Sequence, residues 1–275
     1  MIEIKFDLSN FEAVEIVPIA DVHIGNPLCQ EHILNDIIEY IKEEPDDPKM
    51  ARICLLNGDL TESVTKHSVG NLYDLTMSPS VQVATMINYL LPLTETSEKY
   101  PQGKILSYCS GNHDFGRYKD TGISASESIA VKLGLEDRYS NDGCYSFINL
   151  KRIETNETTP VTLYNQHMSG GGATIGGKAN RIAKINGIIA QIIVGSHVHQ
   201  PITFKEDIIM PSANGRGLTQ RTITYVVTNS FLSYGDYAER SGMRPNTIAI
   251  PKIYVRQGRE RKGRESRYFY TEVLL

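Results

Sequence analysis

The sequence predicts an α/β fold for this chain of 275 residues. In the first half, three strongly apolar runs alternate with two segments whose apolar residues recur at helical spacing. This strand–helix–strand–helix–strand order is typical of a parallel sheet with crossover helices. From about residue 200 the pattern becomes rich in strands, so a β-rich part is expected to follow the α/β part.

The first half contains the clearest elements. Apolar residues at helical spacing from Ile33 to Ile41 predict a helix, which Pro45 and Pro48 close. Gly134 similarly ends a later helix. The elements expected here are strands at 14–20, 51–56 and 105–110, and helices at 33–41, 81–91 and 124–133.

The second half is expected to form mainly strands. These are 144–150, 161–164, 191–194, 202–204, 222–227, 247–255 and 268–274, with a polar turn at 154–158 between the first two. A glycine-rich loop at 169–177 precedes a helix at 178–190. Earlier in the chain, residues 61–80 are polar and irregular, which indicates an insertion that borders a site. Since no repeat or linker divides the chain, residues 1–275 are expected to form one domain.

Composition narrows the classes of function. The formal net charge of −4 excludes a protein that binds nucleic acid with its whole surface, so a polyanion would be held locally or through bound cations. No stretch approaches the roughly 20 apolar residues of a membrane span, and the first residues lack the apolar core of a signal peptide. The four cysteines are scattered without a Cys-x-x-Cys pair. These observations predict a cytoplasmic protein without a membrane partner.

The run Gly111-Asn112-His113-Asp114 follows the third apolar strand. We expect Gly111 to allow a sharp turn with positive φ. Asn112 offers an amide oxygen to a metal ion, His113 can transfer a proton, and Asp114 can orient that histidine by accepting from its far ring nitrogen. Alone, such a run is also compatible with an ordinary turn between a strand and a loop.

Metal-ligating residue types occur at or just after the ends of five expected strands. The set is Asp21, His23, Asp59, Asn112, His113, His167, His197 and His199, and it includes five of the seven histidines; His32 and His67 lie outside it. Side chains at the carboxyl ends of strands converge on the crevice in which α/β proteins place their sites. In the Asp-x-His and His-x-His pairs, both donors share a face if the backbone is extended. Singly, an aspartate here is more often a cap or turn former, and a histidine a hydrogen-bonded polar group.

The complete series resembles the motifs of the calcineurin-like metallophosphoesterase superfamily. It consists of Asp21-x-His23, Gly58-Asp59, Gly111-Asn112-His113-Asp114, His167 and Gly195-x-His197-x-His199. The resemblance implies a β-sandwich flanked by helices (αββα), with a dinuclear metal site at the C-terminal ends of strands. It implies that the first metal ion is held by Asp21, His23 and His199. The second would be held by Asn112, His167 and His197, with Asp59 bridging the two. Mixed nitrogen and oxygen ligands favour Mn²⁺, with Fe and Zn²⁺ as alternatives, over Mg²⁺ or Ca²⁺.

The same resemblance implies a phosphoester hydrolase. A hydroxide that bridges the two metal ions would attack phosphorus directly, with His113 as general acid and Asp114 holding its tautomer. The start Asp21-x-His23-x-Gly25 is similar to that of the superfamily's double-strand-break repair nucleases, and the glycine-rich loop and residues 230–235 resemble members carried by phages. We therefore expect a phosphodiesterase acting on nucleic acid or a nucleotide. The alternatives are a phosphomonoesterase for protein or small-molecule substrates, and a metal-bound scaffold without turnover.

Three basic residues are candidates for substrate binding. Arg117 lies just beyond Asp114, while Lys178 and Arg181 follow the loop 169–177, whose bare backbone and following helix start favour an anion. A surface arginine and a mobile loop are the alternatives. The basic stretch 256–267 is interpreted as a charged hairpin turn, with contact to a nucleic-acid backbone as its alternative. The oligomeric state is left open.

Overall fold

Two six-stranded sheets form the centre of the computed structural model. The structure describes residues 1–65, 72–153, 157–172, 174–185, 187–212, 215–235, 238–239, 245, 248–259 and 267–275. Sheet A contains, in spatial order, β1 (Ile2–Leu8), β6 (Cys144–Lys151), β7 (Thr158–Gln166), β8 (Ile192–Gly195), β10 (Leu218–Val227) and β9 (Ile202–Pro211). Sheet B contains β12 (Arg267–Leu274), β11 (Lys252–Arg259), β2 (Ala13–Ile19), β3 (Met50–Asn57), β4 (Ile105–Cys109) and β5 (Tyr139–Ser140).

Five α-helices are present in the described part of the chain. They are α1 (Glu31–Lys42), α2 (Pro79–Leu90), α3 (Asn112–Thr121), α4 (Ala125–Leu133) and α5 (Ile175–Ala183). Short 3₁₀ turns occur at Leu72–Asp74, Leu91–Thr94 and Glu136–Arg138. None of the described helices is long and apolar enough to cross a membrane.

Sheet B is built around the parallel strands β2, β3 and β4. Every side chain of these three strands is buried, as expected for parallel strands that are covered on both faces. In contrast, β6 in sheet A alternates buried with partly exposed side chains. The predicted strand–helix–strand–helix–strand order of the first half is confirmed, with α1 between β2 and β3 and α2 between β3 and β4.

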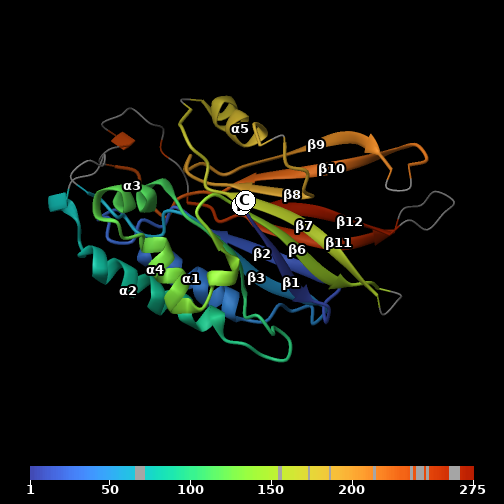
Figure 1. The fold of residues 1–275 in the computed structure, drawn as a ribbon, viewed down its shortest axis with the longest axis horizontal. Coiled ribbons are helices and arrows are strands. Elements are labelled where there is room, and N and C mark those ends of the chain that lie inside the picture. Colours follow the sequence, from blue (N-terminus) through green and yellow to red (C-terminus); the bar gives the residue numbers. More distant parts are fainter. Residues whose placement is uncertain are drawn as a thin grey trace.

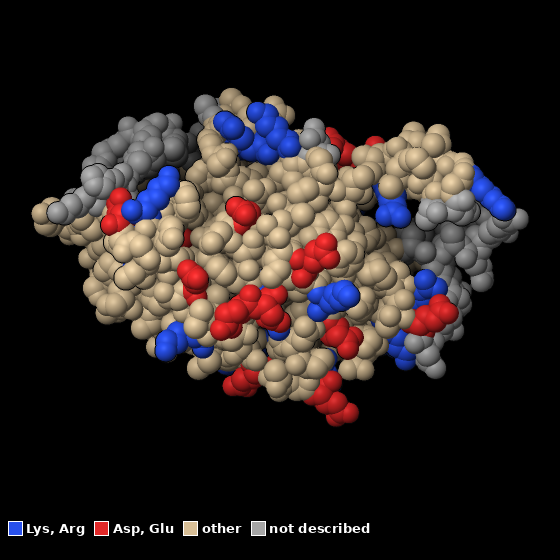
Figure 2. All heavy atoms as spheres, viewed as in Figure 1, with Lys and Arg blue, Asp and Glu red and all other residues tan. Residues whose placement is uncertain are grey.

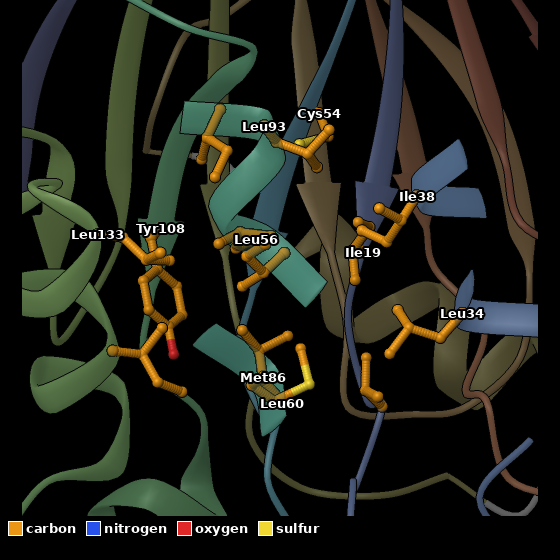
Figure 3. Packing of buried hydrophobic residues seen from close by; sticks show 14 of the residues in the cluster. Ile19, Leu34, Ile38, Cys54, Leu56, Leu60, Met86, Leu93, Tyr108 and Leu133 are labelled. Atoms are coloured by element: carbon orange, nitrogen blue, oxygen red, sulfur yellow. The ribbon is translucent and has the colours of Figure 1, made fainter. Parts of the chain in front are cut away.

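Apolar cores join the sheets and helices into four layers (Figure 1). Between the sheets, Ile16 of β2 and Ile53 of β3 belong to the same buried cluster as Val161 of β7. A second cluster lies between sheet B and the helices α1, α2 and α4, and a third places Ile182 of α5 against sheet A. Figure 3 shows the second cluster, in which Leu34 of α1 lies close to the strands of sheet B. The predicted sandwich of two sheets flanked by helices is confirmed.

Several elements differ from the sequence prediction. β1 was not predicted, although its alternating Ile4, Phe6 and Leu8 are the residues that it buries. α3 was also missed, because its apolar residues Phe115 and Tyr118 are exposed and therefore give no buried-face pattern. β9 continues to Pro211 because it pairs along its length with β10 rather than packing both faces in the core.

The helix after the glycine-rich loop begins earlier and ends earlier than predicted. α5 starts at Ile175, where Oγ1 of Thr174 accepts a hydrogen bond from the backbone N–H of Gly177 at 3.1 Å, and it ends at Ala183. Residues 154–156 of the turn predicted at 154–158, His67, and residues 260–266 of the basic stretch lie outside the described residues.

Candidate metal centre

The candidate site lies where β2, β3, β4, β7 and β8 end, because each predicted metal ligand closely follows one of these strands. Six non-glycine residues in the described chain have a positive φ. Five of them are predicted ligands: Asp21 (51°), His23 (53°), Asp59 (50°), His197 (84°) and His199 (51°). The two spaced pairs therefore do not have the extended backbone that would place both donors on one face. Left-handed backbone costs an L-residue about 1–2 kcal/mol, and such strain concentrates at functional sites.

Asp21, His23 and His199 form a first group, whose potential ligand atoms lie within 4.8 Å of one another. Oδ1 of Asp21 lies 3.2 Å from Nε2 of His199, and its Oδ2 accepts a hydrogen bond from the backbone N–H of His197 at 2.9 Å. Nε2 of His23 is buried and has no hydrogen-bond partner among the described residues. Because buried polar atoms are normally satisfied, this group fits a cation that would supply the missing partner.

Asp59, His167 and His197 form a second group with the same spacing of ligand atoms, within 4.8 Å. Nε2 of His167 lies 3.1 Å from Oδ2 of Asp59 and 2.9 Å from Oδ1 of Asn112. The rings of His167 and His197 are 5.2 Å apart. The fold therefore brings the predicted ligands of the second cation, Asn112, His167 and His197, together near Asp59, which is predicted to bridge the two cations.

Buried polar atoms behind His167 fix the orientation of its ring. Its Nδ1 lies 2.9 Å from the carbonyl oxygen of Asn57 and 2.9 Å from Oγ of Ser196, which itself donates to that carbonyl at 2.5 Å. Because a carbonyl only accepts, Nδ1 must carry the proton. Nε2 is thereby left to face Asp59, which is the arrangement expected of a histidine that ligates a metal ion.

Two glycines let the loops after β3 and β4 approach closely. A Cβ on Gly111 would lie 2.0 Å from Oδ1 of Asp59, and a Cβ on Gly58 would lie 2.6 Å from Nδ1 of His167. Gly58 has a φ of +85°, whereas Gly111 is extended with a φ of −105°. The predicted positive φ of Gly111 is therefore wrong: this position favours glycine because the Asp59 carboxylate occupies the space of a side chain.

His113 lies in the first turn of α3, with its ring 4.7 Å from that of His23. Nδ1 of His113 contacts the carbonyl oxygen of Glu62 at 2.8 Å. Oδ2 of Asp114 instead accepts a hydrogen bond from the backbone N–H of Gly111 at 3.2 Å, at the start of α3. The His113 ring is therefore oriented by the main-chain carbonyl of Glu62 and not by Asp114, as had been predicted. The Asp114 carboxylate instead caps the helix in which it lies.

The charges of the site depend strongly on one another. Burial favours a raised pKa for Asp59, but His167, followed by His113 and His23, holds that pKa well below its usual range. Burial favours a lowered pKa for His167, but the Asp59 carboxylate raises it to about 10. Burial and the charge of His167 lower the pKa of His197. Without a cation, a proton on His167 therefore compensates the buried Asp59 charge, and a bound cation would replace this proton.

Glu62 is a site residue that the sequence analysis did not identify. Its Oε2 lies 3.0 Å from Nδ1 of His23, and a third group of potential ligands contains Glu62 with His23 and His113. The sequence gives one signal for it, an acid three residues after Asp59 at the start of the segment interpreted as an insertion. Its burial comes from tertiary packing and has no local pattern.

The three basic candidates lie on helices that adjoin the site. Arg117 follows His113 by one helical turn on α3, and its Nη1 is buried with no hydrogen-bond partner among the described residues. Nζ of Lys178 donates to Oε1 of Gln200 at 3.1 Å, next to His199 in sequence. Nε of Arg181 donates to the carbonyl of Gly171 at 3.1 Å and so ties α5 to the glycine-rich loop.

The left-handed backbone leads to a stability prediction at His199. In metal-free protein, His199→Gly is expected to be more stable than His199→Ala by about 1 kcal/mol, because only glycine adopts a φ of 51° without strain. Urea unfolding in the presence of a chelator measures the difference. His32, exposed on α1, is the matched control, since alanine should there be more stable than glycine by about 1 kcal/mol. The same order at both positions would contradict the strain.

Comparisons with known proteins give only distant likenesses. No family model matches the sequence, and no curated protein matches it. Among solved structures, Vps29 from Chaetomium thermophilum is similar with 9% identity and a TM-score of 0.35, over 94% of this chain and 95% of that chain. A metallophosphoesterase from Sphaerobacter thermophilus is similar with 12% identity and a TM-score of 0.37, over 87% of this chain and 82% of that chain. Since both TM-scores are below 0.5, the function of this chain is inferred from its own site residues.

Proposed function

We propose that the chain is a phosphoester hydrolase that works with two divalent cations. The observation that carries this proposal is the pair of buried Asp and His groups, which lie side by side with His113 at their edge. Burial favours a raised pKa for Asp21 and the charge of Asp59 adds to this, so the two carboxylates are near each other, although neighbouring histidines lower the pKa of both. Two adjacent sites for cations and an uncommitted acid or base are the components of two-metal phosphoester hydrolysis.

In this proposal the first cation is held by Asp21, His23 and His199. The second is held by Asn112, His167 and His197, and Asp59 lies between the two. Mixed nitrogen and oxygen donors support Mn²⁺, with iron or zinc as alternatives. When bound, the cations would lower the pKa of a water molecule and neutralise charge on the phosphate. Holding the ligands in place is the task of the strained loops and of the buried contacts behind His167.

His113 is proposed to protonate the leaving group. Burial favours a lowered pKa for His113, but the charges of Asp59 and Glu62 and the contact with the Glu62 carbonyl raise it. In the metal-free protein the His113 ring therefore holds a proton more readily than a free histidine. Because Nδ1 faces the Glu62 carbonyl, Nε2 is the atom available to the substrate. Asp114 keeps the start of α3, and with it His113, in position.

We further propose a phosphodiester of nucleotide or nucleic-acid type as the substrate. An alkoxide is a poor leaving group, so cleavage of a phosphodiester that releases one is faster when a residue such as His113 donates a proton to the leaving oxygen. Arg117, Lys178 and Arg181 are the proposed contacts to further phosphate groups. Figure 2 supports this, because basic side chains gather over α5 while acidic side chains are more frequent over the lower part of the same face. A phosphomonoester remains the alternative substrate.

The test compares two chromogenic esters. Metal-stripped protein that is resupplied with Mn²⁺ is expected to hydrolyse an aryl phosphodiester of thymidine faster than a simple aryl phosphomonoester. Lys178→Ala should raise KM for the diester and leave the monoester little changed, since it removes only a proposed contact to a second part of the substrate. Faster cleavage of the monoester would replace the proposal with its alternative. Absence of cleavage of either ester with Mn²⁺, iron and Zn²⁺ would contradict the proposed activity.

A further inference from the structure

Glu62 is a buried acid that the proposed ligand set does not use. Its side chain is 7% exposed, and its Oε2 lies 3.0 Å from Nδ1 of His23. Burying a carboxylate is costly unless a partner compensates its charge. The imidazole that lies against it belongs to His23, a residue proposed to bind the first cation, so the burial of Glu62 is tied to the site.

The backbone around Glu62 is held at both ends. Its own N–H donates to the carbonyl of Ile24 at 3.0 Å, where Ile24 and Thr61 form a parallel bridge. The N–H of Ser63 donates to Oε1 of the buried Gln82 of α2 at 3.1 Å. Ser63 is the sixth non-glycine residue with a positive φ in the described chain, at 49°. The main chain is therefore held on both sides of Glu62.

Glu62 contacts both functional histidines at this edge of the site. Its carboxylate faces His23, while its carbonyl oxygen lies 2.8 Å from Nδ1 of His113. The two imidazole rings meet edge to face, with centroids 4.7 Å apart and planes at 80°. A single residue thus fixes the ring of a proposed metal ligand with its side chain and the ring of the proposed acid with its main chain.

We propose that Glu62 is a positioning residue that aligns His23 with the first cation and His113 with the substrate. The inference rests on the proposed function. A histidine that ligates a metal ion commonly donates its other ring N–H to a carboxylate, which orients the ring and raises its basicity. Nδ1 of His23 lies 3.0 Å from Oε2 of Glu62, a close polar contact whose angles fall outside those of a hydrogen bond. Nε2 is left for the cation, and that atom is also buried without a hydrogen-bond partner among the described residues.

The test measures cation binding directly, on the full chain after removal of metal. Titration with Mn²⁺ is expected to show two equivalents bound by the wild type. Glu62→Ala should weaken the binding of one equivalent about 10- to 100-fold and leave the other unchanged. Glu62→Gln keeps an acceptor oxygen and should recover part of the loss. Glu98→Ala, which removes an exposed acid from a loop, should bind Mn²⁺ like the wild type.

A double-mutant comparison identifies the affected cation. The Glu62→Ala loss should not add to that of Asp21→Ala, which removes a ligand of the same cation, but should add to that of His197→Ala. Thermal unfolding in chelator serves as the check on folding, because a merely structural role would lower the unfolding temperature and weaken both equivalents together. That result would overturn the inference.

Three further outcomes are decisive. Unchanged Mn²⁺ affinity in Glu62→Ala would overturn the positioning role while the proposed function stands. A third equivalent in the wild type that disappears in Glu62→Ala would make Glu62 a ligand together with His23 and His113, whose potential ligand atoms lie within 4.8 Å of its own. Absence of Mn²⁺ binding by the wild type itself would remove the proposed function and the inference with it.

Discussion

Replacement of His113 by alanine is expected to lower kcat for a phosphodiester with an alkoxide leaving group about 10²- to 10⁴-fold, the usual contribution of a general acid. The ring contacts the carbonyl of Glu62 and lies beside that of His23, but it belongs to neither ligand group proposed for the two cations. Mn²⁺ binding should therefore remain at two equivalents. Steady-state kinetics together with a Mn²⁺ titration measures both quantities on the same preparation.

The choice of substrate provides the control for this experiment. An ester with a very good leaving group, such as a nitrophenolate, needs little protonation, so His113→Ala should lose less activity on it than on an alkyl ester. Equal losses on both esters would indicate that His113 does not protonate the leaving group. Full biological function in His113→Ala would instead favour a metal-bound scaffold without turnover.

The parts of the fold that the sequence predicted are those whose burial leaves a local pattern. β2, β3 and β4 are covered on both faces, so each is a nearly continuous apolar run. α3 and the outer part of β9 bury little, and their formation depends on the helix cap at Gly111 and on pairing with β10. Elements that are stabilised by capping and strand pairing bury few side chains, so their sequences lack the periodic apolar pattern from which a helix or strand is predicted.

For the candidate site, too, the sequence predicts only what leaves a local pattern, here at the level of single residues. The proposed ligands could be named from the sequence because each one closely follows an apolar strand. Their conformation could not be predicted, since the left-handed backbone at Asp21 or His199 is set by packing. Aspartate and histidine adopt this conformation more often than most residues, but too rarely for it to be predicted from their identity. Glu62 was missed for a related reason, because an acid in a polar loop gives no sign that it is buried. The role of Asp114 was misassigned because capping and orienting require the same residue type.

Replacement of Asp59 by asparagine is expected to weaken Mn²⁺ binding at both sites and to lower turnover by about 10³-fold or more, since several kcal/mol of charge stabilisation depends on the cations. Oδ1 of Asp59 accepts a hydrogen bond from the backbone N–H of His113 at 2.9 Å, and Oδ2 lies 3.1 Å from Nε2 of His167. Asparagine retains the shape and the first contact. It removes the charge and can place an N–H group where a cation must bind. Mn²⁺ titration and kinetics of the variant measure both effects.

Metal-free protein separates this electrostatic effect from general damage to the fold. The pKa of His167 is raised to about 10 by Asp59, above the roughly 6.5 of an unfolded histidine, so the pair contributes stability that is fully present below pH 6.5. That contribution is lost as the pH rises through about 10. The stability difference between the wild type and Asp59→Asn should therefore shrink between these two pH values in urea unfolding with chelator. A difference that stays constant over this range would mean that Asp59 acts through packing, and it would weaken the case that its charge organises the two cations.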